Sequence, residues 1–526
     1  MRATTLTALS SLLVACGSAA LAAADAPYKH VLLISVDGMH SSDLDWYVSQ
    51  YKNSTFAKLA AQGTTYTNAY ASTPSDSFPG LAGIMTGGTV KTHGMWYDDT
   101  YDRSLYPAGS GCQGPSGTEV QYTEAMDINA NLANGGGGLN ATALPMALVN
   151  GVCKPLFPNQ FIRSNTIMEV AVQAGRTTAW ADKHLVYQWV SGPSGKGLTD
   201  YPSTEINAVP GNKTVQFDST HVDAAINWMN GKAANGSALS DVPAIFGFNM
   251  QAVSVAQKTL KGGYKADLTP SPMLVDAFNS VDAALAKLSA ALDTAQLSNS
   301  TLVVLTAKHG QSPIDRTKLQ LIDPVALANA TGYPDAVLFQ GGDDIGLFWF
   351  NRTAKIDLSV VKANILKNAK VDGALSVLAG KDELVAAGFG DPTTDSRVPD
   401  VIVFPTPGVL YSDKATSIAD HGGHSDDDRH VMLIIKGSDA SAGGKQVADR
   451  VDTTQIAPTI LEALGLGADK LQAVKAEGTK VLPAASSDST APAPQGSVGQ
   501  TSAAVTMTGN RAIAVAAVAA AVAALC

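Results

Sequence analysis

The chain contains little cysteine, few aromatic residues and little positive charge. Four cysteines and 6% aromatic residues among 526 residues exclude a fold held together mainly by disulfides. Lysine and arginine number 36 against 46 acidic residues, and the formal charge of −10 argues against a protein that wraps a nucleic-acid polymer. A small anionic ester is compatible with this charge if a metal ion or a lysine neutralises it locally.

Residues 1–24 have the pattern of a secretory signal peptide. Arg2 precedes a short apolar run from Leu6 to Ala15, and small residues end the segment at Ala24. The sequence before Cys16 also resembles a bacterial lipoprotein cleavage box, so a lipid-modified Cys16 is the alternative. Both interpretations predict an exported protein.

The other end of the chain is low in complexity and then apolar. Residues 484–511 are rich in serine, proline and alanine and predict a linker, and residues 512–526 are uninterrupted small apolar residues. A spanning helix needs about 20 residues, so the tail fits a GPI-anchor signal better. A marginal C-terminal membrane helix is the alternative. We expect a secreted protein anchored at the cell surface, with membrane contact only through this anchor.

Cysteine usage and glycosylation motifs agree with export. Cys16 and Cys526 lie in segments that processing removes, so Cys112 and Cys153 are predicted to form one disulfide across a glycine-rich insertion. Seven Asn-x-Ser/Thr motifs together indicate a glycoprotein. They begin at Asn53, Asn140, Asn212, Asn235, Asn299, Asn329 and Asn351.

Residues 25–483 alternate between apolar strand patterns and helical patterns. The strand patterns cover 30–36, 177–181, 243–248, 301–306, 398–404 and 431–435, and helical patterns cover 56–62, 167–174, 274–292 and 454–464. This alternation predicts an α/β fold with a doubly wound, mostly parallel sheet and helices on both faces. A strand pair within 336–350 and a helix at 358–366 predict a small α+β cap inserted at about 320–395.

Polar side chains follow the predicted strands. Asp37 follows residues 30–36, and Lys308 and His309 follow residues 301–306. Asp182 and His184 come after the strand pattern at 177–181. Parallel strands end at one edge of a sheet, where ligands bind in doubly wound folds. We therefore expect these side chains to line one crevice.

The segment Ser72–Gly88 places a hydroxyl at the start of a helix. Pro79 fits a first helical turn, so Ser77 falls near the N-cap, where free N–H groups and the helix dipole attract an anion. Serine is also an ordinary N-cap residue, and this structural role is the alternative. A catalytic role for Ser77 depends on which residues surround it.

The order of these motifs resembles the type I phosphodiesterase/nucleotide pyrophosphatase family of the alkaline-phosphatase superfamily. The resemblance extends over about residues 30–466. It is carried by a strand ending in Asp-Gly, SFPG followed by TGG, HGMWYDDTYD, a strand ending in KHG, and a late HGG before acidic residues. It implies an alkaline-phosphatase-like fold in which one or two divalent metal ions, usually zinc, hold a nucleophilic hydroxyl.

The resemblance also implies roles for individual residues. Ser77 corresponds to the nucleophile, where threonine is commoner, and would form a covalent phosphoserine. Asp37 and His309 correspond to ligands of one metal ion, and His421 corresponds to a ligand of its partner ion.

The sequence departs from the family pattern at four positions. Lys308 replaces an aspartate ligand, and Gln251 and Val255 align with an aspartate and a histidine. Gly80 stands where nucleotide-cleaving members have an asparagine that helps to bind phosphate. In related sulfatases a lysine supplies positive charge, and Lys308 is expected to do so here beside a single ion. Further donors are sought among Gln251, Asp182, His184, Asp420 and His424.

The sequence therefore predicts a metal-dependent hydrolase of small anionic phosphate esters, secreted or anchored at the cell surface. Two alternatives remain open. The departures at Lys308, Gln251 and Val255 are equally compatible with a non-catalytic surface glycoprotein that retains the fold. The second alternative is a one-metal hydrolase of sulfate or phosphonate esters.

Overall fold

The computed structural model describes residues 26–203, 212–413, 417–438 and 443–483. The predicted signal peptide, linker and anchor signal lie outside these residues. Within the described ranges, no helix combines the length and apolar character needed to cross a membrane.

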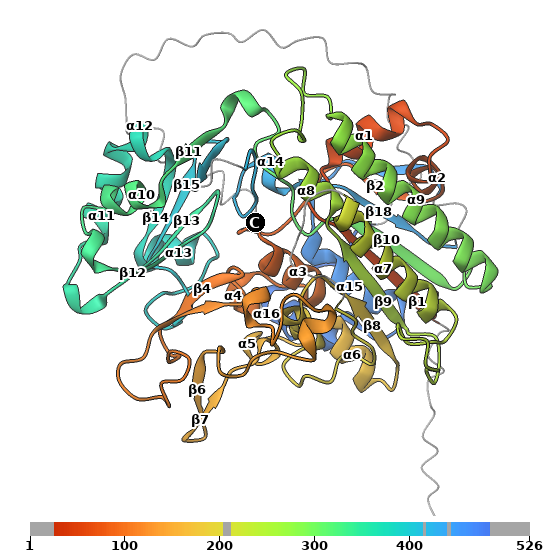
Figure 1. The fold of residues 1–526 in the computed structure, drawn as a ribbon, viewed down its shortest axis with the longest axis horizontal. Helices are drawn as coiled ribbons and strands as arrows, with labels where there is room; N and C mark the ends of the chain where they lie inside the picture. Colours follow the sequence, from red (N-terminus) through yellow and green to blue (C-terminus); the bar gives the residue numbers. More distant parts are fainter. Residues whose placement is uncertain (1–25, 204–211, 414–416, 439–442, 484–526) are drawn as a thin grey trace, which may run out of the picture.

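A seven-stranded sheet forms the centre of the larger lobe (Figure 1), with the order β19-β2-β18-β10-β1-β9-β8. Within it, β1 (His30–Val36) pairs in parallel with the central strand β10 (Thr301–Thr306) and with β9 (Ile245–Met250). Only β18 (Leu433–Lys436) runs antiparallel to the others. The remaining strands are β8 (Thr178–Ala181), β2 (Thr64–Tyr66) and β19 (Lys445–Val447). The prediction of a mostly parallel sheet is confirmed, and β1 and β10 have the predicted bounds.

Helices cover both faces of this sheet because the side chains of β1 alternate between two apolar clusters. Val31 and Leu33 pack into the cluster on one face, and Leu32 and Ile34 pack into the other. The first face is covered by α3 (Ser77–Thr86), α6 (Ile167–Gln173), α15 (Ile456–Ala463) and α16 (Gln472–Glu477). The second is covered by α1 (Ser41–Gln50), α2 (Thr55–Gln62), α7 (Asn212–Met229), α8 (Ala252–Lys258) and α9 (Pro272–Thr294).

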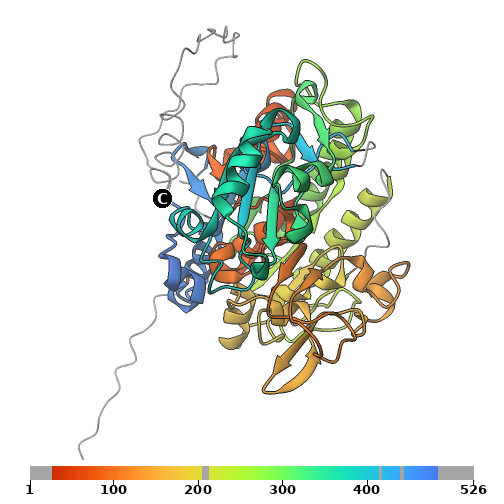
Figure 2. The same cartoon turned by 90° about the vertical axis from the view of Figure 1, so that its left-hand side faces the viewer.

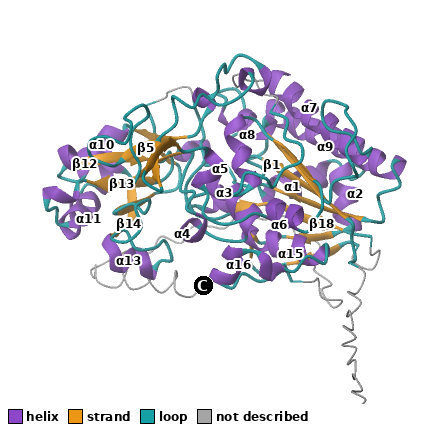
Figure 3. Cartoon of the chain, turned by 90° about the horizontal axis from the view of Figure 1, so that it is seen from below, coloured by secondary structure: helices purple, strands orange, loops and turns teal. Residues whose placement is uncertain are grey.

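A second lobe lies beside the large sheet, as Figures 2 and 3 show from two further directions. Its antiparallel sheet has the order β12-β13-β15-β14. These strands are β12 (Val337–Gly341), β13 (Gly346–Phe350), β14 (Ala374–Ala379) and β15 (Val401–Pro405), and the lobe's helices include α10 (Pro324–Ala330), α11 (Leu358–Lys367) and α13 (Gly380–Ala386). The predicted strand pair within 336–350 is confirmed. The limits of the cap at about 320–395 stay a prediction.

Two strand patterns have a different place from the one expected. The apolar run at 398–404 becomes β15 of the second lobe, because its residues Val401 and Val403 join the apolar cluster of that lobe. The run at 431–435 is divided between β17 (His430–Val431), which pairs with β3 (Ala69–Tyr70), and β18 of the large sheet. An apolar run predicts a buried strand, but it does not specify the sheet.

Two hairpins that were not predicted from the sequence involve the glycine-rich insertion, which was expected at residues 109–159, and the first of them begins before it. β4 (Asp99–Asp102) pairs with β5 (Thr118–Gln121), and β6 (Met146–Val149) pairs with β7 (Val152–Pro155). Asn150 and Gly151 connect β6 to β7 with φ angles of 52° and 77°. Asn-Gly is the preferred pair for such a turn, so this signal was available in the sequence.

The predicted disulfide between Cys112 and Cys153 is confirmed, with a Cα–Cα distance of 5.8 Å. It connects residues 41 positions apart, and loop-closure entropy gives such a link about 4 kcal/mol of stabilisation. We expect the double replacement Cys112→Ser with Cys153→Ser to lower the Tm in thermal unfolding. Because the bridge belongs to the insertion, activity at low temperature is expected to be unchanged. An unaltered Tm would contradict this prediction.

Candidate functional site

Ser77 is the first residue of α3 and is 2% exposed. The N-cap is the preceding residue, Asp76, whose carboxylate accepts hydrogen bonds from the backbone N–H groups of Phe78, at 3.1 Å, and Asp98, at 3.2 Å. The hydroxyl therefore lies at the start of a helix, one position later than a cap. In Figure 1, α3 lies between the large sheet and the second lobe.

Gly80 allows α3 to pack directly on the end of β10. A Cβ atom at this position would lie 2.1 Å from the carbonyl oxygen of Lys308, closer than any side chain tolerates. The contact brings Ser77 Oγ to 3.3 Å from His309 Nε2. The departure from the family pattern at Gly80 thus has a steric reason in this chain.

His309 faces Ser77 with the basic nitrogen of its ring. Its Nδ1 lies 2.7 Å from the carbonyl oxygen of Gly310, an acceptor only, so Nδ1 carries the proton and Nε2 presents a lone pair to the Ser77 hydroxyl. Burial and the neighbouring His421 hold the pKa of His309 well below its usual value. The neutral imidazole can accept a proton.

A pair of opposite charges lies beside these two residues. Lys308 is fully buried, and its Nζ is 3.2 Å from Asp37 Oδ2 and 5.0 Å from the centre of the Tyr187 ring. Asp37 Oδ2 also accepts a hydrogen bond from Asn249 Nδ2 at 2.9 Å and lies 4.0 Å from Lys183 Nζ. Although burial alone raises the pKa of Asp37, the ammonium groups of Lys308 and Lys183 and the hydrogen bond from Asn249 lower it, so the carboxylate is ionised. Its other oxygen, Oδ1, is 3.8 Å from His309 Nε2.

His421 completes the cluster from the loop that precedes α14 (Asp426–Arg429). Its ring lies 3.8 Å from that of His309 between centroids, and its Nδ1 is 3.3 Å from Asp76 Oδ1. The Tyr97 hydroxyl donates a hydrogen bond to the carbonyl oxygen of His421 at 3.1 Å, so the HGMWYDDTYD segment, which carries part of the family resemblance, lies beside the site. Ser77, Asp37, Lys308, His309 and His421 therefore come together as the expected convergence of distant segments requires.

Other predicted donors have different partners. Asp182 is buried and accepts hydrogen bonds from Trp180 Nε1 and from the backbone of Lys183, both at 2.9 Å. Asp420 pairs with Lys258 at 2.5 Å. His424 is exposed and lies 2.8 Å from Thr73 Oγ1.

Two further predicted donors occupy the edge of the same strands. His184 follows β8 as predicted and is buried, and burial lowers its pKa to about 3. Gln251 is the residue before α8, and its backbone N–H donates to Asp218 at 2.9 Å.

Three residues beside the site were given no role from the sequence. Asp76 had a usable signal, because aspartate immediately before a helix is a preferred N-cap. Lys183 follows β8 but carries no motif, and Asn249 lies inside β9. Only the pairing of β9 with β1, which sets Asn249 opposite Ser35, brings its amide to Asp37.

The mostly parallel sheet with helices on both faces and a second lobe beside it is an alkaline-phosphatase-like α/β fold, and the buried Ser77 lies at the carboxyl edge of that sheet. The family model described as type I phosphodiesterase/nucleotide pyrophosphatase matches residues 31–427, and the chain belongs to this family of phosphoric ester hydrolases.

Solved structures show the same fold at low sequence identity. Murine ectonucleotide pyrophosphatase/phosphodiesterase 5, as an inactive variant in complex with AMP, matches with a TM-score of 0.55 and 14% identity over 84% of this chain and 96% of that chain. The human protein matches with a TM-score of 0.52 and 13% identity over 86% of this chain and 96% of that chain. Wild-type alkaline phosphatase PafA matches with a TM-score of 0.55 and 14% identity over 84% of this chain and 96% of that chain. A comparison with curated proteins finds no match.

The family is generally dependent on divalent metal ions, and the residues present do not fit such a centre. A structural or catalytic zinc ion takes at least three protein ligands, and no group of three or more His, Cys, Asp or Glu side chains in the described ranges is arranged to hold an ion. At the second ion position that the family resemblance implies, Gln251 and Val255 would stand beside His421, and neither side chain supplies a carboxylate or an imidazole. At the first position, the Lys308 ammonium lies against Asp37. A dication about 4 Å from an ammonium is repelled by about 8 kcal/mol at an effective dielectric constant of about 20.

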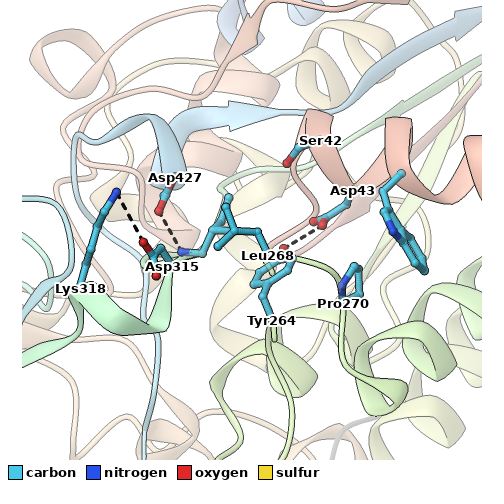
Figure 4. Close-up of a pocket in the computed structure, with 10 residues that line it drawn as sticks. Ser42, Asp43, Tyr264, Leu268, Pro270, Asp315, Lys318 and Asp427 are labelled. Atoms are coloured by element: carbon cyan, nitrogen blue, oxygen red, sulfur yellow. Dashed lines mark hydrogen bonds and ion pairs between the residues drawn. The ribbon is translucent and has the colours of Figure 1, made fainter. Parts of the chain in front are cut away.

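A pocket of about 330 Å³ elsewhere in the large lobe contains none of the predicted site residues (Figure 4). It lies between the start of α1 and the loops around Tyr264 and Asp315. One wall is a buried network in which the Tyr264 hydroxyl donates to Asp43 at 2.8 Å and the imidazole of His40 lies 2.8 Å from the same carboxylate. These side chains satisfy one another, which is typical of a structural network.

Proposed function

We propose that this chain hydrolyses small anionic phosphoric esters with Ser77 as the nucleophile. Family membership supports the reaction class. The observation that carries the proposal is the 3.3 Å approach of Ser77 Oγ to the unprotonated nitrogen of His309, beside a buried lysine. A hydroxyl, a base and a cation at the start of a helix are the groups that phosphoryl transfer to an alcohol requires.

The proposed reaction has two halves. As the bond from Ser77 Oγ to phosphorus forms and the bond to the leaving alcohol breaks, the hydroxyl proton passes to His309 Nε2 and then to the leaving oxygen. In the second half, water attacks the phosphoserine and gives a proton to His309 Nε2, the Oγ–phosphorus bond breaks, and His309 passes that proton to Ser77 Oγ. Lys308 and the first backbone N–H groups of α3 stabilise the charge on the phosphoryl oxygens.

A phosphodiester or pyrophosphate of a nucleotide is the substrate class we favour. The family description and the AMP complex of the murine relative support a small nucleotide-like anion. We further propose that the protein is secreted, glycosylated and GPI-anchored, as its terminal segments and glycosylation motifs indicate. The expected zinc is not part of this mechanism, because the described residues supply no ligand set for it.

A substrate panel tests the proposed function. Purified protein is assayed on p-nitrophenyl esters of a phosphodiester, a phosphomonoester, a phosphonate and a sulfate. We expect turnover of the phosphodiester, and acid quenching during turnover is expected to trap one phosphoryl group on the peptide that contains Ser77. Preferred cleavage of the sulfate or the phosphonate would select the alternative ester class. Absence of turnover on the whole panel would refute the hydrolase and favour the non-catalytic glycoprotein.

A further inference from the structure

Lys308 is a buried cation with hydrogen-bonding capacity to spare. It is 0% exposed and forms its ion pair with Asp37 at 3.2 Å, yet no acceptor among the described residues stands in hydrogen-bonding geometry to its Nζ. An ammonium has three N–H donors, and burying them without acceptors is costly. Such a group is stabilised when an anion enters the site.

The neighbouring atoms show where that anion would lie. Lys308 directly follows Ala307 at the end of β10, and Gly80 of α3 packs on its carbonyl oxygen, so the start of α3 and the ammonium belong to one rigid corner. Lys183 adds a second positive charge 4.0 Å from Asp37 Oδ2, and the buried carboxylate of Asp182 interacts with both lysines. The Lys308 ammonium and the first N–H groups of α3 are the positive groups that an anion at Ser77 would meet.

We infer that the Lys308 ammonium is the resident cation of this centre, so that the site binds a phosphoryl anion without a divalent metal. The inference deepens the proposed function and rests on it for the identity of the anion. Its basis is the conflict between the metal use of the family and the donor set of this chain. An incoming ion would need the Asp37 carboxylate, and the Lys308 ammonium already lies 3.2 Å from its Oδ2. One cation excludes the other by charge and by volume.

The experiment uses the full secreted protein and two readouts that do not depend on turnover. Elemental analysis counts zinc, calcium and manganese in protein purified without chelators. Thermal shift with inorganic phosphate measures anion binding before and after treatment with a chelator. We expect no stoichiometric metal in the wild-type protein and a phosphate-induced stabilisation that the chelator leaves unchanged. Stoichiometric metal, or phosphate binding that the chelator abolishes, would overturn the inference.

Three variants sharpen the test. Lys308→Met removes the charge and keeps the length of the side chain, and we expect it to weaken phosphate binding about ten- to a hundredfold. Lys308→Asp restores a carboxylate ligand and is expected to bind zinc in a calorimetric titration. Lys318→Asp alters a lysine that is 62% exposed and pairs with Asp315, and it is expected to resemble the wild type in both assays.

Each result bears on one claim. Unchanged phosphate affinity in folded Lys308→Met would overturn the role of the lysine. If Lys308→Asp does not fold, the metal count of the wild type and the phosphate titration of Lys308→Met still decide whether the inference holds. If the protein binds phosphate without metal but cleaves no ester, this inference is supported and the proposed function is refuted. The two failures are therefore distinguishable.

Discussion

Replacement of Ser77 by alanine is expected to lower kcat/KM on a phosphodiester by about 10⁴-fold or more, because the substitution removes the oxygen that forms the covalent intermediate. Ser77 is buried at the first position of α3, and its hydroxyl contacts the base His309. Alanine is a good helix former, and the N-cap Asp76 is unchanged, so the fold is expected to persist. Steady-state kinetics and circular dichroism of the same preparation measure both effects.

Ser72→Ala is the matched control for this variant. Ser72 is a second buried serine next to α3, and its hydroxyl donates to the carbonyl oxygen of Pro79 at 3.2 Å. Its loss is expected to cost about 1 kcal/mol of stability and to leave kcat/KM at the wild-type level. If Ser77→Ala retained the wild-type rate, the covalent mechanism would be wrong even in a protein that hydrolyses esters.

The second large effect is expected at His309. His309→Gln removes the ring nitrogen that accepts the Ser77 proton, and loss of a general base of this kind lowers kcat/KM by about 10²- to 10⁴-fold. Glutamine keeps a polar side chain in a fully buried position, which limits the damage to the fold. We expect phosphate binding in the thermal-shift assay to persist in this variant, because Lys308 and α3 are unchanged. Loss of phosphate binding together with activity would indicate a structural role for the ring instead.

The pH profile of the wild type gives an independent check on His309. Because burial and His421 lower its pKa, the imidazole remains neutral and basic at pH values where an ordinary histidine is protonated. The midpoint of the acid limb of kcat/KM should therefore lie well below pH 6.5, the usual pKa of histidine. A base with a depressed pKa loses its activity only when the pH falls below that lowered pKa. A midpoint at or above pH 6.5 would contradict the assignment.

His30→Gln serves as the control for the histidine variant. His30 lies at the opposite end of β1 from the site, and its Nδ1 is 2.9 Å from the carbonyl oxygen of Pro243. Its replacement is expected to leave both the rate and the pH profile unchanged. A similar loss of kcat/KM in both histidine variants would indicate that the effect comes from damage to the sheet as a whole.

Sequence reading was most successful where the signal is local. Apolar runs identified β1 and β10 with their bounds, since a buried parallel strand is continuous in its apolar side chains. Pro79 marked the first turn of α3, and the two cysteines outside the predicted signal peptide and anchor signal identified the disulfide. It failed where the signal is weak or non-local. The helices α1 and α7 were not predicted, because they carry many polar residues, and β15 was not assigned to the second lobe.

For the candidate site, too, the sequence determined some features and the tertiary structure determined others. The positions of Asp37, Lys308 and His309 were determined by the sequence, because each follows an apolar strand whose carboxyl end has to open into the crevice. The tertiary structure alone decided what these side chains do to one another. The ion pair between Lys308 and Asp37, the approach of Ser77 to His309 and the approach of Asp76 to His421 join residues far apart in the chain. Charge interactions and hydrogen bonds depend on distance in space, which no spacing along the sequence specifies.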